Sequence, residues 1–224
     1  MKAILSVAVF IAVVTGALFF PHPAQAGRGI PGSPEFGYGA RLELDGLYLE
    51  DALELAADIP FDWLAVSVRW SALQPNTPYA ARLDSVMAFA ARNHLSVLVS
   101  LTQPPAAALG PTGPDAAQTA ALVQSLAQRY PGTLGAVELF PAANTRAGWG
   151  AEPSPQDYAR LYNQVSAQMQ AAGLPLLLVG CGLQPLAATP NNGEMDDLAF
   201  LAGVYKAGAY PPVVSVLLNE VSAD

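Results

Sequence analysis

Apolar and polar positions alternate in two different periods along most of the chain. Short apolar runs predict strands, and longer segments with apolar residues three and four positions apart predict helices. The predicted strands are 36–44, 63–70, 95–101, 134–140, 174–180 and 213–218, and the predicted helices are 49–57, 83–93, 115–130, 154–173 and 195–206. Because strands and helices follow one another in turn, we expect an α/β fold with a parallel sheet of about six strand and helix units.

The ends of two predicted helices carry specific signals. Asp115 is a candidate N-cap residue, and Pro131-Gly132 stops the helix that follows it. Ser154-Pro155 combines an N-cap serine with a proline at the first helical position, and Gly173 ends that helix. The buried stripe of the second helix is expected to hold Tyr158, Leu161, Tyr162, Val165 and Met169.

The number of units limits the architecture. A closed eight-unit barrel usually takes about 250 residues, whereas this chain has 224 residues and about six units. We therefore expect a TIM-barrel-type (β/α) repeat that is incomplete. An open, doubly wound sheet is the alternative that needs no missing units.

The N-terminus has the pattern of an export signal. Met1 and Lys2 precede an uncharged apolar run over residues 3–20, and Ala24-Gln25-Ala26 is a small-x-small cleavage sequence. We expect a signal peptide at 1–26, a linker at 27–36 and one domain at 37–224, which predicts a secreted or extracytoplasmic protein. The alternative is an uncleaved segment that anchors the protein in a membrane.

Charge and residue counts exclude several kinds of site. The formal net charge of −8 disfavours nucleic acid as a partner. The one cysteine, Cys181, allows no internal disulfide and is expected to be an inert buried thiol. His94 is the one histidine after residue 26, so metal sites rich in histidine and serine–histidine–acid triads are not expected. No cofactor is expected.

Several segments together resemble a known family. VSVRWSALQP at 66–75, ARNHLSVLVSL at 91–101 and PGTLGAVELFPAANTRAGWG at 131–150 are similar to strands two, three and four of clan A glycoside hydrolases. LLLVGCGLQP and MDDLAFLAGVYKAGA resemble the family's fifth strand and the helix after it. The resemblance runs from about Tyr38 to the end of the sequence and implies a β/α barrel and a retaining O-glycosyl hydrolase ancestry.

The fourth-strand segment departs from the family at its catalytic position. The family has Glu, two apolar residues and then Asn-Glu-Pro, in which the second glutamate is the general acid and base. Here Glu138 is retained, but Pro141 replaces the asparagine and Ala142 replaces the acid. The strand that would carry the nucleophile is not reached. The resemblance therefore implies an inactive relative, although whether the protein is an enzyme stays open.

Two carboxylates are weak candidates for a replacement acid. Glu138 shares a strand face with Ala142 but lies roughly 13 Å deeper along the strand, and we expect it to pair inside the sheet with Arg69. The alternative is that both side chains are solvated at an open edge. Glu220, which follows Asn219, could mimic the acid motif, but a solvated terminal residue is the simpler interpretation.

The candidates for carbohydrate binding lie at or after the carboxyl ends of strands, where barrel proteins bind ligands. Exposed indole rings could stack on sugar faces, although tryptophans packed beneath loops are common. Asn219 aligns with a family histidine at the end of strand six. The candidates are Arg69, Trp70, Asn144, Trp149 and Asn219.

Three functions are compatible with this pattern. The leading hypothesis is an exported, glycoside-hydrolase-like protein that is catalytically inactive and binds carbohydrate. The second is a structural or assembly module whose open sheet edges pair with a protein partner or with another copy of the chain. The third is a fragment of a longer O-glycosyl hydrolase.

Overall fold

The computed structural model describes residues 37–174, 176–186 and 193–217. The predicted signal peptide at 1–26 and the predicted linker at 27–36 lie outside these ranges, as do Asn219 and Glu220. Within the described ranges, no helix is both long and apolar enough to cross a membrane.

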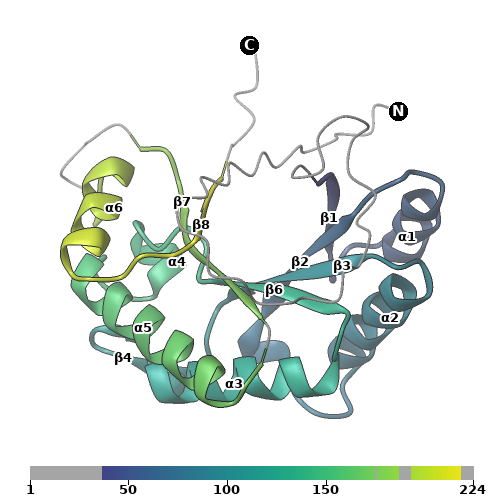
Figure 1. The fold of residues 1–224 in the computed structure, drawn as a ribbon, viewed down its shortest axis with the longest axis horizontal. Coiled ribbons are helices and arrows are strands. Elements are labelled where there is room, and N and C mark those ends of the chain that lie inside the picture. Colours follow the sequence, from purple (N-terminus) through teal and green to yellow (C-terminus); the bar gives the residue numbers. More distant parts are fainter. Residues whose placement is uncertain (1–36, 175, 187–192, 218–224) are drawn as a thin grey trace.

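A curled sheet of six strands forms the centre of the molecule (Figure 1). All of its strand pairs are parallel, and the strands lie across the sheet in the same order in which they follow one another along the chain. This arrangement confirms the predicted α/β class with six units of the TIM-barrel type. A doubly wound sheet needs a point at which the strand order reverses, and this order never reverses. The strands are β1 (Gly39–Glu43), β2 (Trp63–Arg69), β3 (Ser96–Thr102), β6 (Leu134–Leu139), β7 (Leu177–Leu183) and β8 (Val213–Val216).

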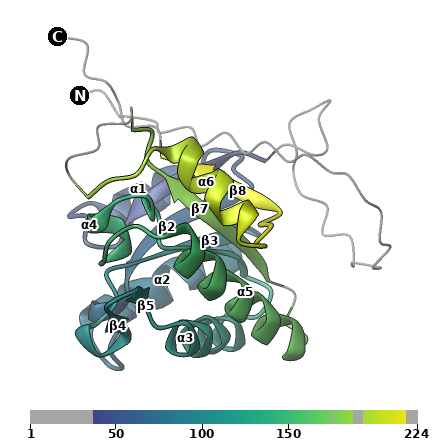
Figure 2. The ribbon, with the colours of Figure 1, turned by 90° about the vertical axis from the view of Figure 1, so that its left-hand side faces the viewer.

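Five helices cover the convex side of the sheet, as Figures 1 and 2 show from two directions. Side-chain caps fix several of their starts: Asp115 Oδ1 accepts a hydrogen bond of 2.8 Å from the Gln118 amide, and Ser154 Oγ accepts one of 3.2 Å from the Asp157 amide. Both caps were predicted, and so was the buried stripe of α5. The helices are α1 (Leu49–Ala57), α2 (Pro78–Arg92), α3 (Ala116–Arg129), α5 (Pro155–Ala171) and α6 (Asp197–Lys206).

The two faces of the sheet differ in burial. In β2, Leu64, Val66 and Val68 are fully buried beneath the helices, and the residues between them face the concave side and are partly exposed. The main core therefore lies between sheet and helices. A small second cluster on the concave side holds Leu98, Ala136 and Val179.

Strand β7 lies three residues later than the sequence predicted. Helix α5 ends at Ala171 and is followed by Gly173, which has a φ of 64°. The Leu174 amide still bonds to the Met169 carbonyl, so the chain is not yet extended there. Beyond Gly180 the strand continues through a bulge at Cys181, where φ is 56° and the register with β8 shifts. The apolar pattern contains no signal for this bulge.

Short elements in the loops were not predicted. A two-stranded antiparallel hairpin of β4 (Leu109–Gly110) and β5 (Gly113–Pro114) precedes α3, and a single helical turn, α4 (Arg146–Trp149), follows β6. Both belong to the loops that pack around the end of β6. Their sequences are too short to show a period.

Candidate functional site

The candidate site lies on the concave face, near the carboxyl ends of the strands. The strand register aligns Glu43, Ser67, Ser100 and Glu138 in one row across β1, β2, β3 and β6. Residues paired in a parallel sheet point to the same face, so this row places polar groups side by side. Arg41 adds to it, since its guanidinium donates a 2.7 Å hydrogen bond to Ser67 Oγ and lies 3.8 Å from the Glu43 carboxylate.

Glu138 is the one buried carboxylate in the part of the chain that the structure describes, with 2% of its surface exposed. The Ser100 hydroxyl donates a hydrogen bond to Oε2, and the Ser215 hydroxyl donates one to Oε1. Gly182 on β7 makes room for this arrangement, because a Cβ at that position would lie 2.5 Å from Glu138 Oε1. Among the described residues, two hydroxyl donors and no cation hold this carboxylate.

The predicted pair of Arg69 and Glu138 is wrong. Arg69 stands in register with Thr102, two residues further along the strands than the row that contains Glu138. Its guanidinium instead forms a 2.7 Å ion pair with Asp45 and lies 5.1 Å from the centre of the Tyr79 ring. The contact with Tyr79, followed by that with Asp45, raises the pKa of Arg69. The side chain is 42% exposed, so it remains accessible at the rim.

Ala142 occupies the position that the family resemblance assigns to the acid. Phe140 and Ala142 both have positive φ, 52° and 60°, so the chain turns sharply as it leaves β6. The Ala142 amide donates to the Gly182 carbonyl, and the Ala142 carbonyl accepts from the Thr145 amide at 2.8 Å and the Thr145 hydroxyl at 2.9 Å. The turn is tightly bonded, and its side chain is a methyl group that cannot transfer a proton.

Trp149 does not suit the predicted stacking on sugar. It is 1% exposed, and its ring packs edge-on against Phe140 at 6.0 Å and tilted against Tyr158 at 5.5 Å. Its indole nitrogen has no hydrogen-bond partner among the described residues. Because α4 folds back towards α5, the ring belongs to the core and not to a rim.

Asn144 is likewise a structural residue and is fully buried. Its amide nitrogen donates to the carbonyls of Gln184 at 2.8 Å and Met195 at 2.9 Å, and its Oδ1 accepts from the Gln184 amide at 2.9 Å. These three bonds join the loop after β6 to the loops after β7 and before α6. The side chain has no free group for a ligand, contrary to the prediction.

Trp70 remains a candidate. It opens a single 3₁₀ turn, Trp70–Ala72, directly after β2, and its ring is partly exposed while it packs against the core. Together with Arg69 it lies at the carboxyl end of β2, as predicted. Asn219 and Glu220 lie outside the described residues.

Glu194 is a carboxylate at this end of the sheet that the sequence analysis missed. It forms an isolated β-bridge with Thr145, three residues after Ala142, and its side chain is exposed. Asp45, paired with Arg69, is a second exposed carboxylate near the carboxyl ends of the strands. Nothing in the sequence predicts that Glu194 lies beside the fourth-strand loop or that Asp45 pairs with Arg69, because these contacts depend on how separate loops fold together.

Cys181 and His94 have structural positions. Burial raises the pKa of the Cys181 thiol to about 12, so it is protonated and unreactive at neutral pH, as predicted. His94 is exposed in the turn between α2 and β3, at the amino ends of the strands, where its φ of 57° lets the Leu95 amide bond to the Ala90 carbonyl. The described residues contain no cluster of three potential metal ligands.

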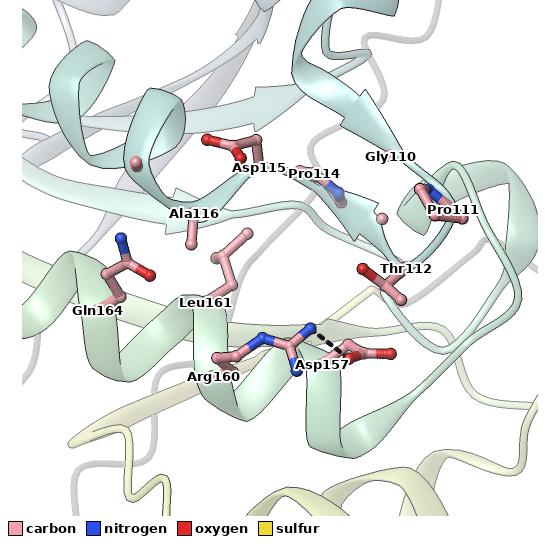
Figure 3. Close-up of a pocket in the computed structure, with 12 residues that line it drawn as sticks. Gly110, Pro111, Thr112, Pro114, Asp115, Ala116, Asp157, Arg160, Leu161 and Gln164 are labelled. Atoms are coloured by element: carbon pink, nitrogen blue, oxygen red, sulfur yellow. Dashed lines mark hydrogen bonds and ion pairs between the residues drawn. The ribbon is translucent and has the colours of Figure 1, made fainter.

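Two hollows lie away from the candidate residues for carbohydrate binding. One, of about 340 Å³, opens between the β4–β5 hairpin and α5 beside the ion pair of Asp157 and Arg160 (Figure 3). The other, of about 620 Å³, lies at the amino ends of β2 and β3 and includes His94 and Asp62. Neither contains a residue of the predicted carbohydrate site.

Comparisons with known proteins give structural matches alone. No protein-family model matches the chain, and no curated protein matches it. Similar solved structures include a family 39 glycoside hydrolase from the gut symbiont Bacteroides cellulosilyticus WH2, with 13% identity and a TM-score of 0.48 over 64% of this chain and 31% of that one. A β-glucosidase from Exiguobacterium marinum matches with 10% identity and a TM-score of 0.46 over 64% and 39% of the two chains. The virulence factor SghA, in complex with its substrate analogue salicin, matches with 16% identity and a TM-score of 0.44 over 71% and 41%.

Two of these proteins are described as a glycoside hydrolase and a glucosidase, the class that the sequence motifs resemble. This chain spans 31% to 41% of the length of the three solved chains. At TM-scores below 0.5 the matches decide neither activity nor ligand. The barrel-type arrangement rests on the strand order of this chain itself.

Proposed function

We propose that this chain is an exported, glycoside-hydrolase-like protein that binds carbohydrate without hydrolysing it. The observation that carries the proposal is that the acid position holds Ala142, while the one buried carboxylate of the described residues, Glu138, already accepts hydrogen bonds from two serine hydroxyls. A retaining glycosidase needs two carboxyl groups about 5–5.5 Å apart, one as acid and one as nucleophile. Among the described residues, Glu138 is the one buried carboxylate, and both of its oxygens already accept hydrogen bonds from serine hydroxyls.

Binding is supported by the polar groups at the carboxyl ends of the strands. Arg69 and Asp45 are accessible at the rim, and Trp70 is partly exposed beside them. Sugar hydroxyls need donors and acceptors in fixed positions, and guanidinium and carboxylate groups supply both. An adjacent aromatic ring can cover an apolar face of the sugar.

Hydrolysis is tested with purified protein and a panel of α- and β-linked aryl glycosides and polysaccharides. We expect no turnover above that of buffer. The variants to test first are Glu194→Gln and Asp45→Asn, because both residues are exposed carboxylates in the loops near the carboxyl ends of the strands. Turnover by the wild type that either variant abolishes would show that a rim carboxylate has taken over the acid role, and the inactive assignment would be wrong.

Binding is tested by affinity electrophoresis in gels that contain the same polysaccharides. Arg69→Ala should weaken retardation by about tenfold or more, since a hydrogen bond to a charged group contributes roughly 1.5–3 kcal/mol. Arg160→Ala is the matched control, because Arg160 also forms an exposed ion pair with an aspartate, on α5. Equal retardation of wild type, Arg69→Ala and Arg160→Ala would argue against a site at the end of β2.

Export is tested on protein recovered from expressing cells by mass spectrometry of its N-terminus. Cleavage by signal peptidase should leave Gly27 as the first residue. An intact Met1 in the membrane fraction would indicate the anchored alternative instead.

A further inference from the structure

The hollow of about 620 Å³ lies at the amino ends of the strands, opposite the rim that carries Arg69 and Trp70. Segments from three successive units of the sheet line it, at 59–62 before β2, 91–96 before β3 and 132–133 before β6. Barrel enzymes bind their substrates at the other end of the strands. The hollow therefore belongs to no site that the family resemblance assigns.

Backbone hydrogen bonds hold the walls of this hollow together. The Ser96 amide donates to the Asp62 carbonyl at 3.0 Å, and the Val97 amide donates to the Thr133 carbonyl at 2.8 Å. The Tyr38 amide donates to Asp62 Oδ2 at 3.0 Å and so fixes that side chain. The hollow is therefore formed before a ligand enters, and its volume lies within the range of roughly 300–1,000 Å³ that is typical of small-molecule sites.

Asp62 brings an unpaired acceptor into the wall. Its other carboxylate oxygen, Oδ1, is buried and has no hydrogen-bond partner among the described residues. A buried acceptor without a partner is costly, and a donor from a ligand removes that cost. Asp62 as a whole is partly exposed and lines the hollow, so a side-chain movement is enough for Oδ1 to meet such a donor.

The α1 side of the hollow carries negative charge. Ala56 and Ala57, at the carboxyl end of α1, belong to the wall, and the last turn of this helix contains no basic residue. Free carbonyl groups at the carboxyl end of a helix carry partial negative charge and favour a cation. Asp58, the C-cap residue, and Asp62 add two carboxylates. This side therefore favours a donor with a positive charge.

The α2 side has the opposite character. Arg92 lies in the last turn of α2 and His94 lies two residues beyond it, and both side chains are exposed at the hollow. Neither side chain forms an ion pair or a hydrogen bond within the part of the chain that the structure describes. With Asp62, they are the charged and titratable residues that line the hollow. A guanidinium without a carboxylate partner suits the carboxylate of a ligand.

The rest of the lining is apolar or carries hydroxyl groups. Ile59, Phe61 and Leu95 supply apolar surface. The hydroxyls of Ser96 and Thr133 have no partner among the described side chains and backbone groups. A ligand that matches the whole lining has a positive group, a negative group and an apolar part.

We propose that this hollow binds a small zwitterion with an apolar side chain, namely a free α-amino acid. Its ammonium group donates to Asp62 Oδ1 beside the carboxyl end of α1, and its carboxylate pairs with Arg92 on the α2 side. Its side chain covers Ile59 and Phe61. A ligand with a single charge leaves one of the two walls unmatched. The site is independent of sugar binding, because it lies at the other end of the strands.

Isothermal titration calorimetry of the purified protein tests the ligand class. The probes are L-phenylalanine, L-leucine and L-tyrosine, together with the amine and the acid that match the amino acid that binds best. The amine lacks the carboxylate, and the acid lacks the ammonium group. We expect saturable binding of at least one amino acid and about tenfold or more weaker binding of both analogues, because each analogue loses a hydrogen bond between charged groups. No saturable binding by any of the three amino acids, or equal binding of either analogue, would overturn the proposal.

Two variants test the two walls separately. Asp62→Asn keeps an acceptor for the Tyr38 amide and removes the charge, and Arg92→Gln changes an exposed side chain, so both should fold, which circular dichroism melting checks. Each should weaken amino-acid binding about tenfold or more and leave retardation by polysaccharides unchanged. The matched controls are Asp51→Asn and Arg160→Gln, which are exposed outside the hollow and should bind like the wild type. Unchanged affinity in either wall variant would contradict the proposed site.

Discussion

The Ser215 hydroxyl on β8 donates a hydrogen bond to the Glu138 carboxylate on β6, across the intervening strand β7. This contact passes over Gly182, whose missing side chain leaves space for the carboxylate. With Ser100 on β3 as the second donor, one buried acid connects three strands of the sheet. A residue that the family resemblance places four positions before the catalytic acid thus has a bonding role within the fold.

Removal of the Ser215 hydroxyl should destabilise the protein. Ser215→Ala leaves a buried carboxylate oxygen without its donor, which costs roughly 1–3 kcal/mol. The free energy of unfolding, measured by urea denaturation, gives the change. Ser125→Ala, on the exposed side of α3, is the control with the same loss of a hydroxyl. Equal stability of both variants would mean that water replaces Ser215 at Glu138.

Gly182→Ala tests the space next to the same carboxylate. The added methyl would lie 2.5 Å from both Glu138 Oε1 and Pro141 Cα, so strand β7 must shift, and we expect a loss of about 1–3 kcal/mol in unfolding free energy. Gly110→Ala in the β4–β5 hairpin is the matched control, because its methyl would meet its nearest neighbour at 3.7 Å. A stable Gly182→Ala variant would contradict the close packing described for this position.

Much of the fold follows from local patterns. The predicted helix at 49–57 has the observed bounds of α1, and the predicted strand at 134–140 differs from β6 by one residue. These elements are regular, so the spacing of their apolar residues shows directly whether each segment is a helix or a strand. The bounds of strand β7 were predicted wrongly because a turn at Gly173 follows the helix and Cys181 adds a bulge to the strand. Neither feature changes the pattern of apolar residues from which the strand was predicted.

The site was harder to predict than the fold. Trp149 and Asn144 follow a strand end, which favours a ligand role, but both are buried. Trp149 packs against Phe140, Tyr158 and the β4–β5 hairpin, and Asn144 is held by hydrogen bonds to the loops after β7 and before α6. Those contacts join residues about 40 to 50 positions apart, and no periodicity encodes them. The predicted partner of Arg69 was wrong for a related reason. The alternation of side chains shows on which face of the sheet a residue lies, but not how far along the strand it lies relative to a residue on another strand.

Asn144→Ala should destabilise the loops around the end of β6. Three side-chain hydrogen bonds are lost and two partly buried carbonyls and one amide lose a partner, so we expect a decrease of about 3 kcal/mol in unfolding free energy. Hydrogen exchange at the Gln184 amide should accelerate in parallel. Asn163→Ala removes one exposed bond of 3.2 Å to Gly208 and should cost less than about 1 kcal/mol. Slow exchange at Gln184 in the Asn144 variant would show that the loops do not depend on this side chain.

The Cys181 thiol should react only when the protein opens. Its pKa in the folded protein is about 12, above the ordinary value of 9.0, so at pH 8 a disulfide reagent should modify it slowly in buffer and fast in guanidinium. The raised pKa also predicts that the contribution of this group to stability is intact below about pH 9 and falls between pH 9 and 12, because only the unfolded chain releases the proton there. Fast stoichiometric labelling without denaturant would place the thiol at an accessible site.

The agreement between strand order and chain order has a consequence for how this protein is made. Each strand of the large sheet lies next to the one formed just before it, so a nascent chain never waits for a segment that the ribosome has yet to supply. Every new unit can dock on the finished ones, and the sheet can grow from β1 towards β8 during synthesis.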